Sequence, residues 1–284
     1  MPVRSFKQVD VFTARPFLGN PLAVVLDGRG LSVDEMQHFA DWTNLSEATF
    51  LLPPQDPRAD YRVRIFAPGR ELPFAGHPTI GSCHAWLEAG GRPRRPDDVV
   101  QECAAGLVRL RRDGTRLAFA APPLLRSGPL DEPELLAVAS GLGIAPQEIA
   151  GHAWCDNGPG WRALLLQSAG QVLSLRPDAA QLAGRFVGVV GPLPPGAPDG
   201  CAFEVRAFFP GAGGFAEDPV TGSLNAALGQ WLIGAGLAPT AYIASQGSAI
   251  GRAGRVHVTQ DAQDRATVWV GGDAITCIDG SVHL

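Results

Sequence analysis

Apolar and polar positions alternate along several short segments of the N-terminal half, and this period of two is typical of half-buried β-strands. The first such segment runs from Phe6 to Thr13. A capping box, in which Ser32 precedes Glu35 by three residues, predicts a helix over Ser32 to Trp42. A hairpin turn is expected at Asp113-Gly114. The other strands expected in this half are Pro21 to Leu26, Ala48 to Leu52, Tyr61 to Phe66, Val99 to Cys103, Leu107 to Arg111 and Leu117 to Ala120.

The second half repeats this mixture of many strands and few helices. Helices are expected over Glu134 to Leu142 and over Gly222 to Ile233, and the latter carries apolar residues at helical spacing. Strands and helices do not alternate regularly, which disfavours a doubly wound parallel sheet. The strands expected here are Ala163 to Gln167, Val187 to Val190, Phe203 to Phe208, Tyr242 to Ser245, Arg255 to Thr259, Thr267 to Val270 and Ile275 to Ile278.

Each half contains one notably apolar helix. In the first half a Pro/Gly-rich turn, Glu71 to Ser82, leads into a helical segment from Cys83 to Glu88. A helix without a polar face must be buried on nearly all sides. The pattern therefore predicts an α+β fold of two domains, each with mostly antiparallel strands wrapped around a central helix.

The boundary between these domains is expected in a proline-rich stretch. Residues 122–133 form the best linker candidate because prolines recur there. This gives an N-terminal domain over residues 1–121 and a C-terminal domain over residues 134–284, with the last strand able to pack back on the first domain. The length of 284 residues also favours two domains.

The two halves share a short pattern, Pro-x-x-Gly-Ser-x-x-Ala. It begins at Pro78 and again at Pro219, 141 residues later. Because both copies lead into apolar helices, we expect two related turn-to-helix elements. A helix start exposes unpaired N–H groups and the positive end of the dipole, and it can therefore hold an anion such as a carboxylate.

Composition excludes several classes of protein. The net charge of −5 and the pI near 5.7 argue against nucleic-acid binding. The chain has no run of about 18 apolar residues, so no membrane span is expected. The N-terminus lacks the apolar core of a secretory signal. The five cysteines are scattered, without a C-x-x-C pair, and the six histidines show no metal-binding spacing. We expect a cytoplasmic protein with no metal and no bound redox cofactor.

Three titratable residues are candidates for proton transfer. Glu47 lies among apolar neighbours, where burial would raise its pKa toward neutrality and suit a general acid or base. His77 stands at the turn before the second helix, where the dipole favours its neutral form. Asp218 precedes Pro219 and could orient another group or exchange protons. The alternatives are a loop glutamate, a structural histidine and a helix-capping aspartate.

Hydroxyl groups near the second turn are candidates for substrate binding. Thr221 and Ser223 could hold a carboxylate, or could serve as plain N-caps. Two further motifs are set aside. The stretch Gly211 to Ala216 matches a dinucleotide fingerprint but is not followed directly by a helix. The stretch Gln246 to Arg252 lacks the ending of a phosphate loop and is expected to be a turn near the site.

Taken in order, the motifs of this chain resemble those of the PhzF family, the phenazine-biosynthesis isomerase-like proteins of the diaminopimelate-epimerase fold. One such piece would be weak, but the ordered set spans nearly the whole chain. The matching pieces are Gln8 to Thr13, Gly19 to Val24, Asn44 to Phe50, Ala75 to Thr79, Gly158-Pro159 with Trp161, Glu217 to Ser223, Gln246-Gly247, Gly251-Arg252 and Val270 to Gly272.

The resemblance implies two pseudo-symmetric domains, each a β-barrel-like sheet around a central helix, with an active site between them, a homodimer and no cofactor. In the epimerases and racemases of this fold, two cysteines at the helix starts form an acid/base pair. Here the matching positions are expected to be Ala75 and Val220, 145 residues apart. Neither residue can carry a proton, so a two-cysteine racemase mechanism is excluded.

By the same resemblance, Glu47 would move a proton between carbons of a small, cyclic or unsaturated carboxylate, assisted by His77 and Asp218. Backbone N–H groups at Gly76 and Gly222, together with Ser46 and Ser223, would bind the carboxylate of the substrate. Two alternatives stay open: an amino-acid racemase or epimerase that uses non-cysteine bases, and a non-catalytic small-molecule-binding protein on the same scaffold.

Overall fold

The structure is a computed structural model that describes residues 2–211 and 214–284. The chain divides into two compact units: unit 1 runs up to Ala120 and includes Gly271–Leu284, and unit 2 comprises Ala121–Val270. Helices and strands occur in both, and antiparallel strand pairs predominate. The α+β class expected from the sequence is therefore confirmed.

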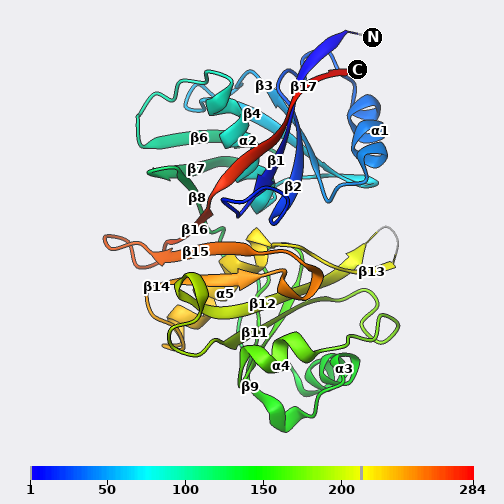
Figure 1. Cartoon of the computed structure of the whole chain (residues 1–284), viewed down its shortest axis with the longest axis vertical. Helices are drawn as coiled ribbons and strands as arrows, with labels where there is room; N and C mark the ends of the chain where they lie inside the picture. The colour runs from blue at the N-terminus through cyan, green and yellow to red at the C-terminus, as the bar shows by residue number, and fades with distance from the viewer. Residues whose placement is uncertain (1, 212–213) are drawn as a thin grey trace. The chain divides into compact units, whose positions relative to one another are not determined.

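Unit 1 is a single run of paired strands with two helices (Figure 1). Parallel pairing occurs between β2 and β3 and between β4 and β6, and the other pairs are antiparallel. Its elements are β1 (Val3–Val11), β2 (Asn20–Val25), α1 (Val33–Thr43), β3 (Ala48–Leu52), β4 (Tyr61–Ala67), β5 (Arg70–Leu72), α2 (Gly76–Glu88), β6 (Asp98–Cys103), β7 (Gly106–Asp113), β8 (Arg116–Ala120) and β17 (Ala274–His283).

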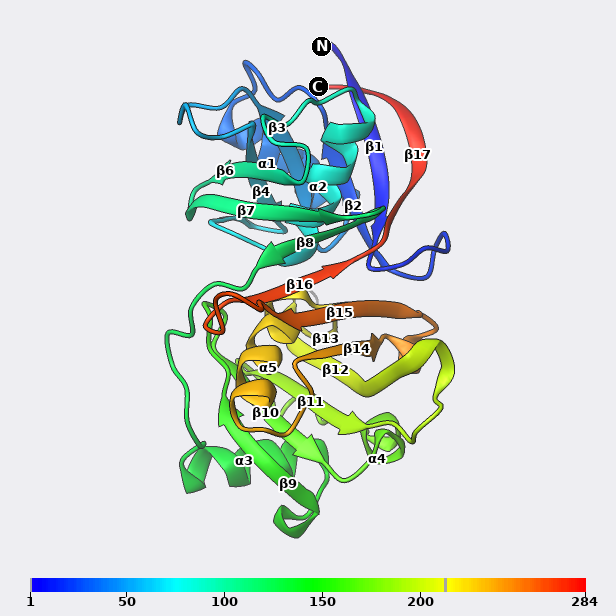
Figure 2. The ribbon, with the colours of Figure 1, turned by 90° about the vertical axis from the view of Figure 1, so that its left-hand side faces the viewer.

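The C-terminal strand β17 pairs with β1 and returns the end of the chain to unit 1 (Figures 1 and 2). The sequence predicted only the short strand Ile275 to Ile278 here. A nearly buried lysine joins β17 to the rest of the unit, since Lys7 Nζ lies 2.7 Å from Asp279 Oδ2 and 3.2 Å from Glu88 Oε2. Buried and exposed positions do not alternate along β17, because the four consecutive residues from Ile278 to Ser281 are all exposed.

Helix α2 packs against β1, β2, β3, β6, β8 and β17 and is buried along most of its length (Figure 2). It begins at Gly76, seven residues before Cys83, so the expected start was wrong. The later start was expected because proline usually breaks a helix. In the first turn, however, Pro78 is tolerated, because an N–H group at that position would have no partner within the helix. Gly81 allows close packing, since a Cβ there would lie 2.6 Å from Leu22 Cδ2.

Helix α1 begins as its capping box predicts. The Ser32 side chain accepts from Glu35 N at 3.2 Å, and the Glu35 carboxylate accepts from Ser32 N at 2.8 Å. The helix ends at Asn44, whose left-handed conformation (φ 54°) turns the chain toward β3. Together these two local signals fix where Glu47 emerges, three residues after the helix cap.

Unit 2 carries three helices and a second set of strands. Parallel pairs join β10 to β11 and β12 to β14. Strands β9 and β13 and helix α4 were not expected from the sequence. The elements are α3 (Glu132–Leu142), β9 (Ile149–Trp154), β10 (Trp161–Leu166), α4 (Ala169–Ser174), β11 (Phe186–Pro192), β12 (Cys201–Gly211), β13 (Gly214–Glu217), α5 (Gly222–Gly234), β14 (Ala241–Gln246), β15 (Gly254–Gln260) and β16 (Val268–Gly272).

Helix α5 is the apolar helix of unit 2, and it matches the expected span to within one residue. Two glycines bring it against strands. A Cβ on Gly188 of β11 would lie 2.3 Å from Leu224 of α5, and a Cβ on Gly229 of α5 would lie 2.6 Å from Val258 of β15. The helix is therefore packed closely at its start and along its second turn.

The proline-rich stretch that the sequence marks as a linker has little regular structure. Between Ala120 and Glu132 an isolated bridge joins Arg126 to Asp156, and single backbone hydrogen bonds join Ala121 to Val268 and Gly128 to Trp154. No described helix is long and apolar enough to cross a membrane. The rejected dinucleotide match, Gly211 to Ala216, includes residues 212 and 213, which lie outside the described residues.

Candidate active site

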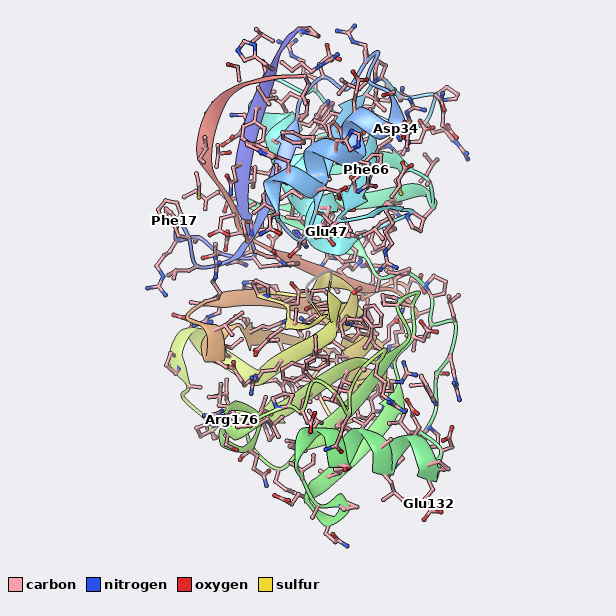
Figure 3. All side chains as sticks on the ribbon, turned by 90° about the vertical axis from the view of Figure 1, so that its right-hand side faces the viewer. Phe17, Asp34, Glu47, Phe66, Glu132 and Arg176 are labelled. Atoms are coloured by element: carbon pink, nitrogen blue, oxygen red, sulfur yellow. The ribbon has the colours of Figure 1, made fainter. Side chains whose placement is uncertain are left out.

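Glu47 lies on the turn between α1 and β3, next to Ser46 (Figure 3). Its side chain is 16% exposed, so the carboxylate is largely shielded from solvent yet still reachable. The turn itself is anchored at its far end by β3, which lies between β2 and β4. A carboxylate in this position is held by rigid secondary structure on both sides.

His77 is the second residue of α2, and its ring faces Glu47. The Nε2 atom lies 3.3 Å from Glu47 Oε2, and the side chain is 6% exposed. Burial lowers the pKa of the His77 imidazole to about 3, because the low-dielectric surroundings penalise the charged form. The ring is therefore neutral at physiological pH.

Asn20 is the partner of the other ring nitrogen of His77. The Asn20 Nδ2 atom lies 3.4 Å from His77 Nδ1, and Asn20 is completely buried. With the amide assigned in this orientation, Nδ1 accepts and the proton of the neutral ring sits on Nε2. The Nε2 atom is buried and has no well-aligned hydrogen bond among the described residues, although it lies beside the carboxylate. His77 thus holds an N–H group that can be given to a ligand.

A tight turn before β2 places Asn20. The Gly19 N–H group donates to Asp10 Oδ2 at 3.0 Å, and a Cβ on Gly19 would lie 2.2 Å from the carbonyl oxygen of Val11. Only glycine fits this close approach. Asn20 was not among the site residues expected from the sequence, and the available signal was the turn at Gly19-Asn20 between two expected strands.

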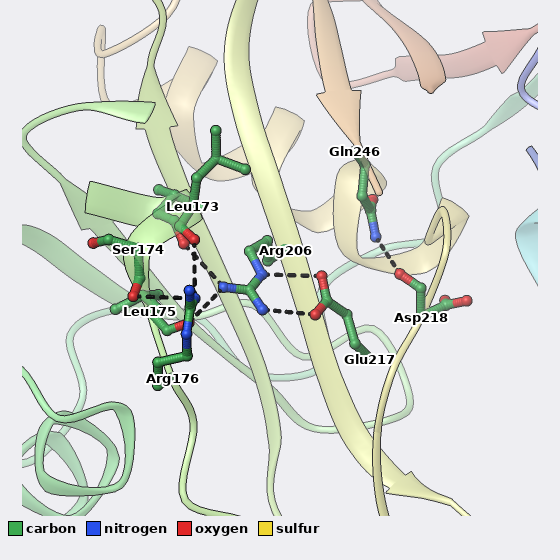
Figure 4. A network of polar contacts seen from close by, with 9 residues as sticks. Leu173, Ser174, Leu175, Arg176, Arg206, Glu217, Asp218 and Gln246 are labelled. Atoms are coloured by element: carbon green, nitrogen blue, oxygen red, sulfur yellow. Dashed lines mark hydrogen bonds and ion pairs between the residues drawn. The ribbon is translucent and has the colours of Figure 1, made fainter. Parts of the chain in front are cut away.

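In unit 2, Asp218 and Thr221 lie on the turn between β13 and α5. The Thr221 hydroxyl group donates to Asp218 Oδ2 at 2.7 Å. Gln246, at the end of β14, reaches the same turn, where its Nε2 atom donates to the Asp218 carbonyl oxygen at 3.2 Å and to Thr221 Oγ1 at 2.8 Å (Figure 4 shows the first of these contacts). Asp218 is therefore not a simple helix cap, and Gln246 is a residue that sequence reasoning placed only in a nearby turn.

Ser223 is engaged by side chains of an adjacent loop and strand. Its Oγ atom accepts from Trp161 Nε1 at 3.1 Å, and its carbonyl oxygen accepts from Asn157 Nδ2 at 2.8 Å. Neither contact is an N-cap bond. The indole nitrogen of Trp161 can only donate, so this contact does not use the hydroxyl proton of Ser223, which can be donated to another group.

The starts of α2 and α5 differ from those of the other α-helices. At α1, α3 and α4 a serine or aspartate side chain accepts a backbone N–H group, whereas the cap residues of α2 and α5, Ala75 and Thr221, make no such bond. Without a side-chain cap, the first N–H groups of a helix are available to an anion. The sequence-predicted residues Gly76 and Gly222 are the first residues of these two helices.

The helix starts also correct the register of the internal repeat. Gly222 lies 146 residues after Gly76, so the cap residue equivalent to Ala75 is Thr221 and not Val220. Val220 is fully buried and precedes the cap. The letter-matched offset of 141 residues was wrong, since it pairs positions about one helical turn apart. Thr221 carries a hydroxyl group, but a hydroxyl does not replace a thiol as an acid/base, and this one is committed to Asp218.

Among the residues described, no group of three or more histidine, cysteine or acidic side chains could hold a metal ion. The five cysteines are free thiols. Burial raises the pKa of Cys83 and of Cys155 to about 12, which makes both poor nucleophiles.

Comparison with known proteins yields matches over the full length of the chain. The chain is 38% identical to Antisense-enhancing sequence 1 of Schizosaccharomyces pombe, with 100% of both proteins covered. It is 33% identical to the trans-2,3-dihydro-3-hydroxyanthranilate isomerase of Pseudomonas aeruginosa, over 97% of this chain and 98% of that enzyme. In fold it is similar to a PhzF family protein of Bacillus anthracis, with a TM-score of 0.81, 22% identity and complete coverage of both chains.

An α+β protein with a neutral buried histidine beside a carboxylate, and with relatives that are named isomerases, belongs to the isomerase class of enzymes. The family model for phenazine biosynthesis-like proteins (PhzC-PhzF) matches residues 9–280. The chain therefore belongs to the PhzF family, as its motifs predicted, and is a PhzF-like isomerase.

Proposed function

We propose that this protein moves a proton between two carbons of a small, cyclic or unsaturated carboxylate, without a cofactor. The observation that carries the proposal is the pair formed by Glu47 and His77, with 3.3 Å between Oε2 and Nε2. With the ring proton assigned to Nε2, the carboxylate is the group of this pair that can accept a proton from carbon. Glu47 is therefore the proposed base.

In the proposed reaction, Glu47 removes a proton from an acidified C–H bond of the substrate and returns it elsewhere on the conjugated system. His77 donates its Nε2–H to a polar group of the substrate while charge develops. Asp218 assists proton transfer, and its assignment to the same substrate rests on the family resemblance. General acid/base catalysis of this kind contributes roughly 10²–10⁴ in rate.

The uncapped starts of α2 and α5 support a carboxylate-bearing substrate. The N–H groups at Gly76 and Gly222, with the hydroxyl groups of Ser46 and Ser223, are the proposed donors to the substrate. Thr221 lies at the second start but is 5% exposed and hydrogen-bonded to Asp218, so we propose that it acts through Asp218. Donors aimed at developing negative charge are often the largest single contribution to catalysis.

The finer architecture is also part of the proposal. Two thirteen-residue helices, α2 and α5, each apolar and uncapped, support pseudo-symmetric domains with a barrel-like wrap around a central helix. The family resemblance supports a homodimer. Five free cysteines fit a reducing cytoplasm.

The first test is isomerisation of trans-2,3-dihydro-3-hydroxyanthranilate, the compound in the name of the Pseudomonas aeruginosa relative, together with a panel of small unsaturated carboxylic acids. In D₂O the parent protein should incorporate deuterium at a substrate carbon, and Glu47→Gln should lose at least a hundredfold in rate. Glu71→Gln is the control, because Glu71 is a partly buried carboxylate of the same unit that pairs with Arg64.

Each alternative has its own outcome in this test. Full activity of Glu47→Gln on a substrate that the parent turns over would show that Glu47 is not the base. Loss of optical rotation from L-amino acids would favour a racemase or epimerase. Ligands that bind unchanged, with no carbon–hydrogen exchange anywhere in the panel, would favour a non-catalytic binding protein.

A further inference from the structure

The side-chain amide of Gln246 is completely buried and makes hydrogen bonds with both ends. Its Oε1 atom accepts from Thr221 N at 3.1 Å and from Asn225 Nδ2 at 2.8 Å. Its Nε2 atom donates to the Asp218 carbonyl oxygen at 3.2 Å and to Thr221 Oγ1 at 2.8 Å. Four bonds saturate the amide, so Gln246 has a single orientation.

Backbone groups determine that orientation. A backbone N–H group can only donate and a backbone carbonyl can only accept, so Thr221 N must face Oε1 and the Asp218 carbonyl must face Nε2. Asn225 is fixed in the same way, because its Nδ2 atom also donates to the Thr221 carbonyl at 2.9 Å. Exchanging the oxygen and nitrogen of Gln246 would place like groups against each other at both backbone contacts.

The direction of the Thr221 hydroxyl follows from this arrangement. Since Oγ1 accepts from Gln246, its own proton points to its other neighbour, Asp218 Oδ2, at 2.7 Å. A hydroxyl that donates to a carboxylate stabilises the ionised form of that carboxylate. The chain of donors therefore runs from Gln246 through Thr221 to Asp218.

We propose that Gln246 is a positioning residue that, by orienting the Thr221 hydroxyl, keeps Asp218 an ionised hydrogen-bond acceptor in the resting enzyme. Asp218 can then accept a proton or a hydrogen bond from the substrate while Glu47 acts on the C–H bond, and it can donate a proton only after it has taken one. The inference rests on the proposed function in one respect, namely that Asp218 exchanges protons with the substrate. The hydrogen-bond relay itself does not depend on that role.

The test follows the carboxyl carbon of Asp218 by ¹³C NMR during a pH titration, with Asp218→Asn to assign the signal. Thr221→Val should raise the titration midpoint of Asp218 by about one pH unit, since one charge-assisted hydrogen bond is lost. Thr221→Ser keeps the hydroxyl and should restore the parent midpoint. An unchanged midpoint in Thr221→Val would overturn the proposal.

A double-mutant cycle then tests the part of Gln246. In Gln246→Met the donor to Thr221 Oγ1 is lost, so the hydroxyl is no longer directed to Asp218 and the midpoint should rise. The rise should be larger with Thr221 present than in the Thr221→Val background, where there is no hydroxyl to redirect. Equal rises in the two backgrounds would show that Gln246 does not act through Thr221.

Other charges near this turn are constant across the cycle. They include Glu217 on β13 with its partner Arg206 on β12, while the first turn of α5 carries no acidic residue. Gln101→Met is the matched control, because Gln101 is an equally buried amide that bonds Tyr61 and Thr79 in unit 1. It should lower stability without moving the Asp218 midpoint.

Kinetics separate this inference from the proposed function. If Asp218→Asn isomerises substrate at the parent rate while the titration shifts occur as expected, the catalytic role of Asp218 fails and the relay stands. If Asp218→Asn is inactive but Thr221→Val leaves both midpoint and kcat unchanged, the relay fails and the catalytic role stands. If the relay and the catalytic role of Asp218 are both correct, Thr221→Val should lower kcat about tenfold with KM little changed, and Thr221→Ser should restore the parent kcat.

Discussion

The amide nitrogen of Asn20 lies 3.4 Å from Nδ1 of His77, on the opposite side of the ring from Glu47. With the amide assigned in this orientation, the proton of the neutral ring lies on Nε2. This tautomer explains how a ring with a pKa near 3 can still be a hydrogen-bond donor at the site, because the neutral form keeps its proton on the nitrogen that faces the carboxylate.

A carboxylate in place of the Asn20 amide should change the protonation of His77. In Asn20→Asp the ring lies between two carboxylates, which favours a proton on Nδ1 as well as on Nε2. We expect a loss of at least tenfold in kcat. Nitrogen-15 NMR of the imidazole reports the change directly, with only Nε2 protonated in the parent and both nitrogens protonated in the variant. The same protonation in both proteins would contradict the assignment.

The buried neutral His77 should also make stability depend on pH. Its pKa is about 3 in the folded protein and about 6.5 when unfolded, so the unfolded chain binds the extra proton between these values. The contribution is fully present above about pH 6.5 and is lost as the pH falls toward 3, at no more than about 1.4 kcal/mol per pH unit. Urea unfolding of the parent and of His77→Asn between pH 7 and 5 measures it.

The difference between those two proteins isolates the histidine, because the carboxylates that titrate in the same range are common to both. The free energy of unfolding of the parent should fall faster with decreasing pH than that of His77→Asn. Parallel curves would mean that His77 is charged, or accessible to protons, in the folded state.

Helix α2 offers a prediction about packing. In Gly81→Ala the added methyl group would lie 2.6 Å from Leu22 and 2.9 Å from Val11, both fully buried. Overpacking of this kind costs about 1–3 kcal/mol in the free energy of unfolding. Gly234→Ala, at the end of α5, is the control because nothing lies within 4 Å of its added Cβ. It should be neutral or slightly stabilising, and thermal unfolding of both variants distinguishes the two cases.

Much of the local structure could be predicted because local signals were sufficient. The capping box at Ser32 gave the start of α1, and the strand Ala48 to Leu52 was predicted to the residue. The start of α2 was missed because a proline in the first turn resembles a helix breaker. The short strand β13 was missed although it pairs with the strand directly before it, β12, because its glycine-rich stretch was weighed only as a dinucleotide match.

The candidate site was only partly accessible to sequence reasoning. The titratable residues stood out because charged groups are rare among apolar neighbours. Asn20 and Gln246 did not stand out, because a neutral amide gains its role only from partners that are distant in sequence, 57 residues away at His77 and 25 at Thr221. Such partners are set by strand pairing and helix placement, which a single sequence does not reveal.

The turn that carries Asp218 is held from its other side by a buried ion pair (Figure 4). Arg206 Nη2 lies 2.7 Å from Glu217 Oε2 and Nε lies 3.0 Å from Oε1, with exposures of 6% and 12%. Arg206 Nη1 also donates to the carbonyl oxygens of Val172 and Leu175 in and just after α4. This arginine therefore ties α4 to the residue just before Asp218.

Removing one partner should cost more than removing both. Arg206→Met leaves the Glu217 carboxylate buried without a counter-charge and should lower the free energy of unfolding by about 3 kcal/mol or more. The double variant Arg206→Met, Glu217→Leu has no stranded charge, so it should recover part of that loss. Urea unfolding of the two single variants and the double variant gives the coupling energy. A double variant as unstable as the sum of the singles would show that the pair is not coupled, and that Arg206 stabilises the fold only through the α4 carbonyls.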